Sequence, residues 1–356
     1  YYVNDVVAPL KTMLETDLAW SSTDFGFFTG GYSFLNVFFL MLIWGGLILD
    51  RFGIRFTGKL ATILMVGGTA LEYYAMTGLA GADATLFGIN EIFGYKTGVF
   101  VAFAGYSIFG VGAEVAGITV SKIIAKWFKG KELATAMGVQ VALARIGSQA
   151  GYAVAIPLAR AIGISTPVLL GLVLLLGGMI AFFIFAVMDK KLDKQMEAAA
   201  IAAGTEDEEE KFSFKDVKNI LVNLGFWLIA LLCVLFYSCV FPFQKFASEL
   251  MIIKYGINEN VAGTYAGLPA LGALILTPVF GGFIDKRGKS ASIMLLGSAM
   301  LICVHFIYAI PDINYWLVAI VLMIILGIAF SLVPSAMWPA VAKIFPVSQL
   351  GTAYAL

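Results

Sequence analysis

The feature of this chain that most constrains its fold is a series of long apolar windows. Each window is near or above the length of about 20 residues that a helix needs to cross the hydrocarbon core of a bilayer. There are nine, at 26–49, 57–80, 98–125, 133–159, 166–188, 222–252, 260–284, 290–310 and 315–342. We therefore expect an all-α membrane protein that crosses a bilayer many times.

Composition excludes several classes of protein. The chain is 60% apolar and only 13% charged, whereas globular proteins are nearer to half apolar and a quarter charged. Its 23 basic and 23 acidic residues cancel, which leaves no surplus charge for a nucleic-acid partner. The single histidine and three cysteines fit no metal or disulfide spacing. No nucleophile–base arrangement or phosphate loop is present in the sequence, so we expect neither an enzyme nor a metal or other cofactor.

The basic residues indicate which way the chain lies in the membrane. The connections at 50–59, 122–132, 189–218 and 285–289, together with Lys343, hold 17 of the 23 basic residues, and the opposite side holds four. Basic residues collect on the cytoplasmic side, so we assign the first side as cytoplasmic and the other as external. The long charged connection predicts a solvated linker, 189–218, between an N-terminal helix bundle, 1–188, and a C-terminal one, 219–356.

A short motif occurs twice, once in each half. It reads GGLILDRFGIR at 45–55 and GGFIDKRGK at 281–289, each at the cytoplasmic end of a predicted span. The first glycine would let helices approach closely, the acid would pair with a base, and the later glycine would permit a tight turn. The residues are Gly46, Asp50, Arg51, Gly53 and Arg55 in the first copy and Gly281, Asp285, Lys286 and Gly288 in the second. Two copies at equivalent places predict an internal duplication and a structural, gating role.

These motifs resemble the signature loop of the major facilitator superfamily, GxxxDRxGR. The resemblance implies two pseudo-symmetric six-helix bundles around a central cavity that opens alternately to either side. By this resemblance, the nine windows correspond to helices two to ten of a twelve-helix fold, and we expect the chain to lack most of helix one and helices eleven and twelve.

Longer stretches resemble one family within that superfamily, the lysosomal dipeptide transporters. They are YYVND at 1–5, WFKGKELATAMGVQVALARIGS at 127–148, VFPF at 240–243 and MWPAVAKIFPVSQLGTAY at 337–354. The resemblance implies dipeptide transport without a coupled ion, by a monomer in the lipid bilayer, with an accessory membrane subunit left open. It favours the lysosomal membrane if it extends to location, and the plasma or inner membrane if the chain is prokaryotic.

Ionisable residues inside a span are costly and are therefore candidates for function. The sequence offers Glu114, Arg145, Lys245 and Glu249, besides the only histidine, His305. Glu114 and Arg145 lie about 12 and 13 residues from one cytoplasmic connection, hence roughly 18 to 20 Å from that surface. We interpret them as a substrate site, because a carboxylate and a guanidinium complement the two ends of a dipeptide. The resemblance implies the same roles. A purely structural ion pair is the alternative.

Further candidates follow from their depth in the membrane. We expect Gln140, Asn36, Tyr237, Phe241 and Trp338 to line the cavity around the charged pair. Lys245 and Glu249, four residues apart, favour a local helical pair over an external gate. Glycines on 98–125 and on 133–159, among them Gly105, Gly112, Gly147 and Gly151, predict close packing of those two helices.

Three functions stay open on the sequence alone. The first is a uniporter for small zwitterionic peptides. The second is a proton-coupled carrier of organic anions or other small solutes, with Arg145 as the anion site and Glu114 as the proton site. The third is a sensor or scaffold that no longer transports.

Overall fold

The computed structural model describes residues 1–81, 84–128, 133–203 and 219–345. Apart from a short hairpin on the side that the basic residues predict to be external, β1 (Glu91–Ile92) and β2 (Tyr95–Lys96), the regular structure of this part is helical. The N-terminal half contains α1 (Tyr2–Val6), η1 (Ala8–Leu10), α2 (Lys11–Asp17), α3 (Ser22–Phe38), α4 (Met41–Thr77), α5 (Thr97–Trp127), α6 (Leu133–Ile162) and α7 (Thr166–Ala203). The C-terminal half contains α9 (Leu224–Ile253), α10 (Glu259–Ala266), α11 (Leu268–Arg287), α12 (Ser290–Ala309) and α13 (Trp316–Ile344).

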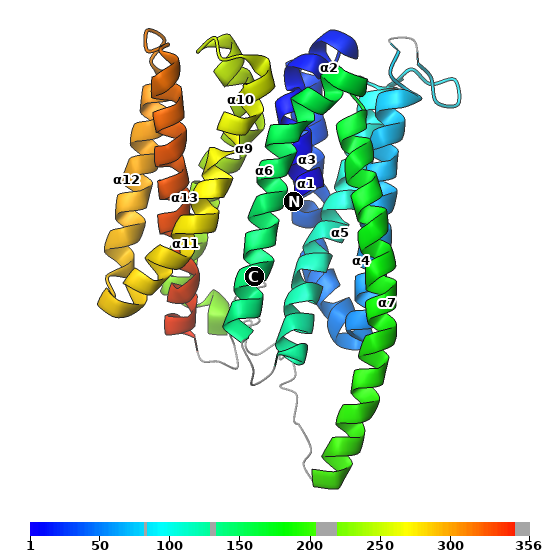
Figure 1. The fold of residues 1–356 in the computed structure, drawn as a ribbon, viewed down its shortest axis with the longest axis vertical. Coiled ribbons are helices and arrows are strands. Elements are labelled where there is room, and N and C mark those ends of the chain that lie inside the picture. Colours follow the sequence, from blue (N-terminus) through cyan, green and yellow to red (C-terminus); the bar gives the residue numbers. More distant parts are fainter. Residues whose placement is uncertain (82–83, 129–132, 204–218, 346–356) are drawn as a thin grey trace.

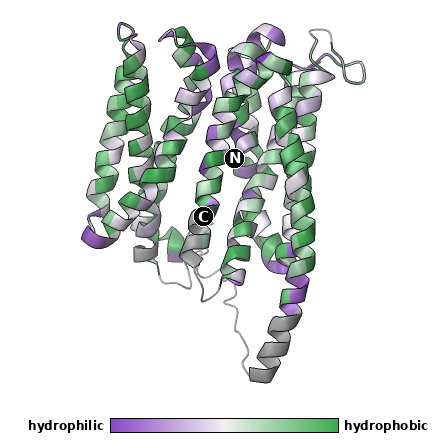
Figure 2. Cartoon of the chain, in the orientation of Figure 1, coloured by the Kyte–Doolittle hydropathy of each residue, from purple (hydrophilic) through white to green (hydrophobic). Residues whose placement is uncertain are grey.

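The helices form two groups that stand side by side (Figure 1). In one group α5 packs against α3 and α4, and α7 packs against α4; in the other α13 packs against α11 and α12. Helix α6 contacts both groups, through α1 and α7 on one side and α10 and α11 on the other. Apolar residues dominate the middle of the helices and polar residues gather near their ends (Figure 2). The predicted all-α membrane architecture is confirmed.

Fewer helices than predicted qualify as complete spans. In the described part six helices are long and apolar enough to cross a membrane, or up to seven if α3 and α4 together form one span. These two helices are bent by 58° at a break that falls inside the predicted window 26–49. The break is at Leu40, whose φ of 52° is left-handed. Helix α6, which carries Gln140, Arg145 and Gln149, is not among the six.

Both copies of the repeated motif form the glycine turn that their sequence predicts. Gly53 has φ 75° inside α4, and Gly288 has φ 66° at the end of α11. The predicted close approach at the first glycine is wrong, because a Cβ at Gly46 or Gly281 would meet open space. The neighbouring Gly45 makes the approach instead, since a Cβ there would lie 2.6 Å from Val115 Cγ2.

The other glycines pack against partners that differ from those predicted. On α5, Gly105 lies against the backbone of Gly68 in α4, and Gly110 lies against the backbone of Tyr32 in α3. On α6, Gly147 and Gly151 lie against α1. Helices α5 and α6 therefore turn their small residues to different neighbours, and the predicted close packing of these two helices is wrong.

The predicted linker begins as a helix. Helix α7 continues to Ala203 and projects beyond the cytoplasmic ends of the other helices (Figure 1). The rest of the linker, 204–218 with its acidic block, lies outside the described residues.

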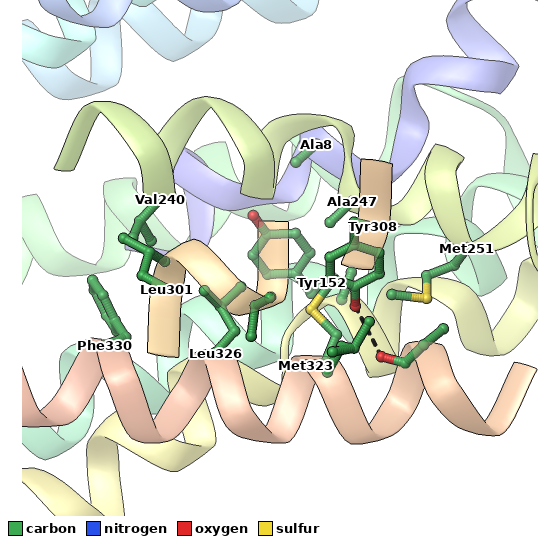
Figure 3. Close-up of a cluster of buried hydrophobic side chains, with 14 of the residues drawn as sticks. Ala8, Tyr152, Val240, Ala247, Met251, Leu301, Tyr308, Met323, Leu326 and Phe330 are labelled. Atoms are coloured by element: carbon green, nitrogen blue, oxygen red, sulfur yellow. Dashed lines mark hydrogen bonds between the residues drawn. The ribbon is translucent and has the colours of Figure 1, made fainter. Parts of the chain in front are cut away.

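The two halves meet on the external side. A core cluster of the C-terminal half includes Ala8 of η1 and Tyr152 of α6 (Figure 3). Gly263 of α10 lies so close to α6 that a Cβ there would overlap the carbonyl oxygen of Tyr152. In the described part, the hydrogen bonds and ion pairs that join the halves all involve external halves of helices or external connections. The external side is thus closed in this structure.

Candidate substrate site

A pocket of about 470 Å³ lies within the N-terminal group of helices. Its walls come from α1, α3, α4, α5, α6 and α7, and most of its lining is apolar. The polar side chains that line it include Asn4, Tyr32, Glu114 and Gln140. Glu114 and Gln140, which are both predicted site residues, therefore face the same cavity.

Glu114 is held by a single neutral hydrogen bond. The hydroxyl group of Tyr32 donates to its Oε1 at 2.8 Å, and the side chain is only partly buried. Among the ion pairs of the described residues, none includes Glu114. A carboxylate next to a cavity without a basic partner is available to bind a cationic group of a ligand.

Arg145 faces the other half of the molecule. Its guanidinium carbon lies 5.2 Å from the centroid of the Phe330 ring on α13, which is the geometry of a cation–π contact. Phe330 in turn packs against Tyr237 and Phe241, whose rings are stacked with centroids 5.1 Å apart. Tyr237 also interacts with Arg145 and with Trp338. Four of the predicted residues thus meet between α6, α9 and α13.

Glu114 and Arg145 do not form an ion pair with each other in this structure. They lie 13 and 12 residues from the facing ends of α5 and α6, as their predicted common depth requires. Their side chains point in different directions because α5 and α6 pack against different neighbours. The alternative that the two residues simply neutralise each other is therefore wrong for this state of the protein.

Asn36 has no place in this pocket. Its Nδ2 donates to the carbonyl oxygen of Tyr32 at 3.0 Å, one turn earlier in α3, and its Oδ1 is buried without a partner among the described residues. Asn36 is not among the residues that line this pocket, and its amide is used within its own helix.

Three site residues were missed by sequence reasoning. Phe330 lies on the same helix as Trp338 and two turns before it, a spacing that could have placed both on one face. Tyr32 lies one turn before Asn36. Nothing in the sequence except its place in YYVND marks Asn4 as a site residue, because its position depends on how α1 packs against α6 and α7.

The predicted local pair of Lys245 and Glu249 is wrong. Each side chain contacts the opposite half instead, which is the external-gate alternative. Lys245 donates to the carbonyl oxygen of Asn4 at 2.5 Å and lies 3.7 Å from Asp5 Oδ1. Glu249 pairs with Lys11 of α2.

Lys11 is the centre of a group that we call the external latch, formed by Lys11, Glu15, Ser22 and Glu249. Its ammonium donates to Glu15 Oε1 at 2.7 Å, to Ser22 Oγ at 2.8 Å and to Glu249. Burial acts to lower the pKa of Lys11, but the hydrogen bonds to Glu15 and Glu249 outweigh it and the pKa is raised. The hydrogen bonds from Lys11 and from Ser22 lower the pKa of Glu15.

The motif residues lie at the cytoplasmic end, and none of them lines the pocket. Asp50 accepts from Lys122 of α5 at 2.9 Å, and Arg55 pairs with Asp189 and Asp193 of α7. Arg51 lies against the ring of its neighbour Phe52. The side chain of Asp285 lies outside the described part, and the described contacts of Arg55 and Asp50 stay within the N-terminal half.

Comparison with known families decides the identity of this arrangement. Residues 1–356, the whole of this chain, match the Major Facilitator Superfamily. The chain belongs to that superfamily. It is an integral, multi-pass membrane protein, and its superfamily and relatives are transporters.

Members of the superfamily resemble the chain in sequence and in fold. It is 29% identical over 368 residues to the "Lysosomal dipeptide transporter MFSD1" of Homo sapiens, covering 99% of this chain and 72% of that protein. The nucleoside transporter NupG has a TM-score of 0.67 at 13% identity, covering 99% of this chain and 84% of that one. The inward-open xylose transporter XylE of E. coli has a TM-score of 0.58 at 17% identity, covering 99% and 82%. At these identities the two solved structures show the fold alone.

Proposed function

We propose that this transporter moves dipeptides across a membrane by alternating access, as a uniporter. The observation that carries the proposal is that Glu114 and Arg145 share one depth but have no ion pair with each other or with another described residue. Each charge is held by an aromatic side chain, Tyr32 or Phe330. In this proposal a ligand that brings both an ammonium and a carboxylate group binds to both charges at once.

The chemistry of the two sites suits the two ends of a peptide. Glu114 lies in the apolar pocket, where a charge-assisted hydrogen bond to an ammonium is stronger than in water. The Arg145 guanidinium can grip a carboxylate with two parallel hydrogen bonds, and its contact with Phe330 holds its plane in place. The two charges of a single amino acid are closer together than those of a dipeptide, so we expect an amino acid to reach only one of the two groups.

Two further observations support the proposal. Relatives named lysosomal dipeptide transporter, among them those of Homo sapiens and Danio rerio, align over 99% of this chain. The external closure, with the substrate pocket inside the membrane, is one of the two states that alternating access requires.

A thermal-shift screen of the purified transporter tests the proposal. We expect dipeptides to raise the melting temperature and free amino acids to leave it unchanged. A ligand at 100 times its dissociation constant stabilises the native state by about 2.7 kcal/mol. Equal stabilisation by amino acids would contradict binding at both ends.

The same screen separates the alternatives. Stabilisation by dicarboxylates, with none by dipeptides, would favour an organic-anion carrier that uses Arg145 alone. Dipeptide binding without any transport in liposomes would favour a sensor.

A further inference from the structure

The external half of the membrane contains a buried acid that the substrate site does not use. Glu72 of α4 is fully buried, and both its carboxyl oxygens lack a hydrogen-bond partner among the described residues. Thr69, one turn earlier, is also fully buried, and its hydroxyl likewise has no partner there. Five residues separate Glu72 from the external end of α4, about 7.5 Å.

The titratable groups around Glu72 come from several helices. Lys245 of α9 interacts with it electrostatically, and so does Tyr106 of α5. Asp5 of α1 lies 3.7 Å from the Lys245 ammonium. On α3, Tyr32 packs against Tyr106 with ring centroids 5.7 Å apart.

The hydrogen bonds fix the charge of Lys245. Its Nζ donates to the carbonyl oxygen of Asn4 at 2.5 Å and to the hydroxyl of Tyr106 at 3.1 Å, and Asp5 is its third oxygen neighbour. Two hydrogen bonds donated by the nitrogen and a carboxylate oxygen at ion-pair distance favour the charged ammonium form of Lys245. The Tyr106 hydroxyl is itself used, because it donates to the carbonyl oxygen of Asn4 at 2.6 Å.

Charge balance then decides the state of Glu72. Lys245 and Asp5 already neutralise each other, so an ionised Glu72 would leave one uncompensated negative charge in a fully buried place. An isolated buried charge costs far more than a neutral carboxyl group. With the external side closed, the charges of Glu72, Asp5 and Lys245 sum to zero only when Glu72 holds a proton.

Opening the external side would change this environment. Lys245 belongs to the C-terminal half, while Glu72, Asp5, Asn4 and Tyr106 belong to the N-terminal half. Separation of the halves removes the ammonium from Asp5 and Asn4 and admits water between them. Hydration allows a carboxyl group to ionise.

We propose that Glu72 is a proton-binding site that takes up a proton when the external side closes and returns it to the same side when it opens. The proposal rests on the alternating access of the proposed function, but not on the identity of the substrate. Acid on the external side favours closure. In this proposal the proton returns to the side from which it came and is not carried across the membrane.

Pulsed electron paramagnetic resonance can measure the effect without substrate. Nitroxide labels at D17C and I253C report the external gap, since both positions are exposed and α2 contacts α9. The native cysteines Cys233, Cys239 and Cys303 are first replaced by serine. We expect the closed fraction to rise as pH falls from about 8 to 5, with the closed-to-open ratio changing by up to about tenfold per pH unit.

Variants assign the effect to one residue. Glu72→Gln is expected to remove the pH dependence and favour the closed form at every pH, whereas Glu72→Asp is expected to keep it. The matched control Glu91→Gln, an exposed acid of the external hairpin, should behave like the wild type. An unchanged pH response in Glu72→Gln would overturn the proposal, as would a wild-type gap that ignores pH.

Infrared difference spectroscopy of the wild type keeps the test valid if Glu72→Gln fails to fold. We expect the carbonyl band of a protonated carboxyl group to accompany closure and to shift in Glu72→Asp. Absence of this band in the closed form would also overturn the proposal. If the label pair showed both an open and a closed distance, but in proportions that do not change with pH, the proton site alone would be rejected. If the label pair showed a single distance at every pH, with and without dipeptide, alternating access would be rejected.

Discussion

The guanidinium of Arg145 lies over the ring of Phe330, 5.2 Å from its centroid, so a charge carried by α6 is held by a side chain of α13. This contact joins the N-terminal and C-terminal halves near the middle of the membrane. A cation–π contact orients the guanidinium without neutralising it, which leaves its hydrogen-bond donors available for a ligand carboxylate.

Removal of the Phe330 ring should therefore weaken peptide binding. We expect Phe330→Leu to lower dipeptide affinity about fivefold, equivalent to about 1 kcal/mol for a cation–π contact, when measured by titration calorimetry. Phe306→Leu is the matched control, because Phe306 on α12 is 69% exposed. Equal affinities for Phe330→Leu and wild type would show that the ring does not position Arg145.

Chemically blocked peptides can separate the roles of the two charges. Glu114→Gln should lower the affinity for a free dipeptide about tenfold or more, since hydrogen bonds to charged groups contribute about 1.5–3 kcal/mol. The same change should leave an N-acetylated dipeptide unaffected, because that ligand has no ammonium group. Arg145→Gln should show the mirror pattern with a C-amidated dipeptide. If each variant lowered affinity for all ligands equally, the assignment of one charge to each terminus would be wrong.

The external latch should control how readily the external side opens. Lys11 is almost fully buried while Glu249 is partly exposed, so we expect Lys11→Ala to shift the equilibrium toward the open form by roughly 2 kcal/mol. The nitroxide pair D17C and I253C measures that shift. Thr16→Ala, an exposed change on the same short helix, is the control, and a closed fraction as high as in the wild type would contradict the role of Lys11.

The pKa values of the external latch predict its pH range. The pKa of Glu15 is lowered from its ordinary value of 4.5, so its contribution is present above that value and is lost as pH falls through the lowered pKa. The pKa of Lys11 is raised above 10.5, so its contribution is lost only as pH rises through that raised pKa. In Glu72→Gln, which lacks the other pH-sensitive acid, the gap should thus be constant between about pH 5 and 10. A transition near neutral pH in this variant would mean that another group controls closure.

Liposomes test whether a proton is coupled to transport. We expect liposomes that contain the protein to equilibrate a labelled dipeptide without a proton gradient, and an imposed gradient not to concentrate it. The reason is that Glu114 must stay ionised to hold the peptide ammonium, while Glu72 exchanges its proton on one side only. Accumulation that a protonophore and Glu114→Gln both abolish would establish symport instead.

The sequence predicted the depth of the site but not the direction of its side chains. The positions of Glu114 and Arg145 relative to the connection between α5 and α6 follow from helical rise alone. Which way each side chain points depends on which neighbours the glycines of α5 and α6 contact, and these contacts join residues far apart in the chain. Spacing within one helix cannot supply that information.

The burial of Glu72 could not be predicted from the apolar windows of the sequence. Glu72 lies near the end of the predicted span 57–80, and the ionisable residues that the sequence singles out as candidates do not include it. Its burial arises because α5 packs closely against α4 at Gly105 and because Asp5, Asn4 and Lys245 meet nearby. The sequence does not predict the break at Leu40 either, because neither glycine nor proline occurs at that position.

Gly263 lies so close to the backbone of Tyr152 that external closure requires a residue without a Cβ atom at position 263. An alanine at position 263 would act as a wedge between α10 and α6, although it would touch no charge and no substrate. We expect such a change to favour the form in which the external side is open, and this form would be a reagent for selecting ligands or antibodies specific to that state.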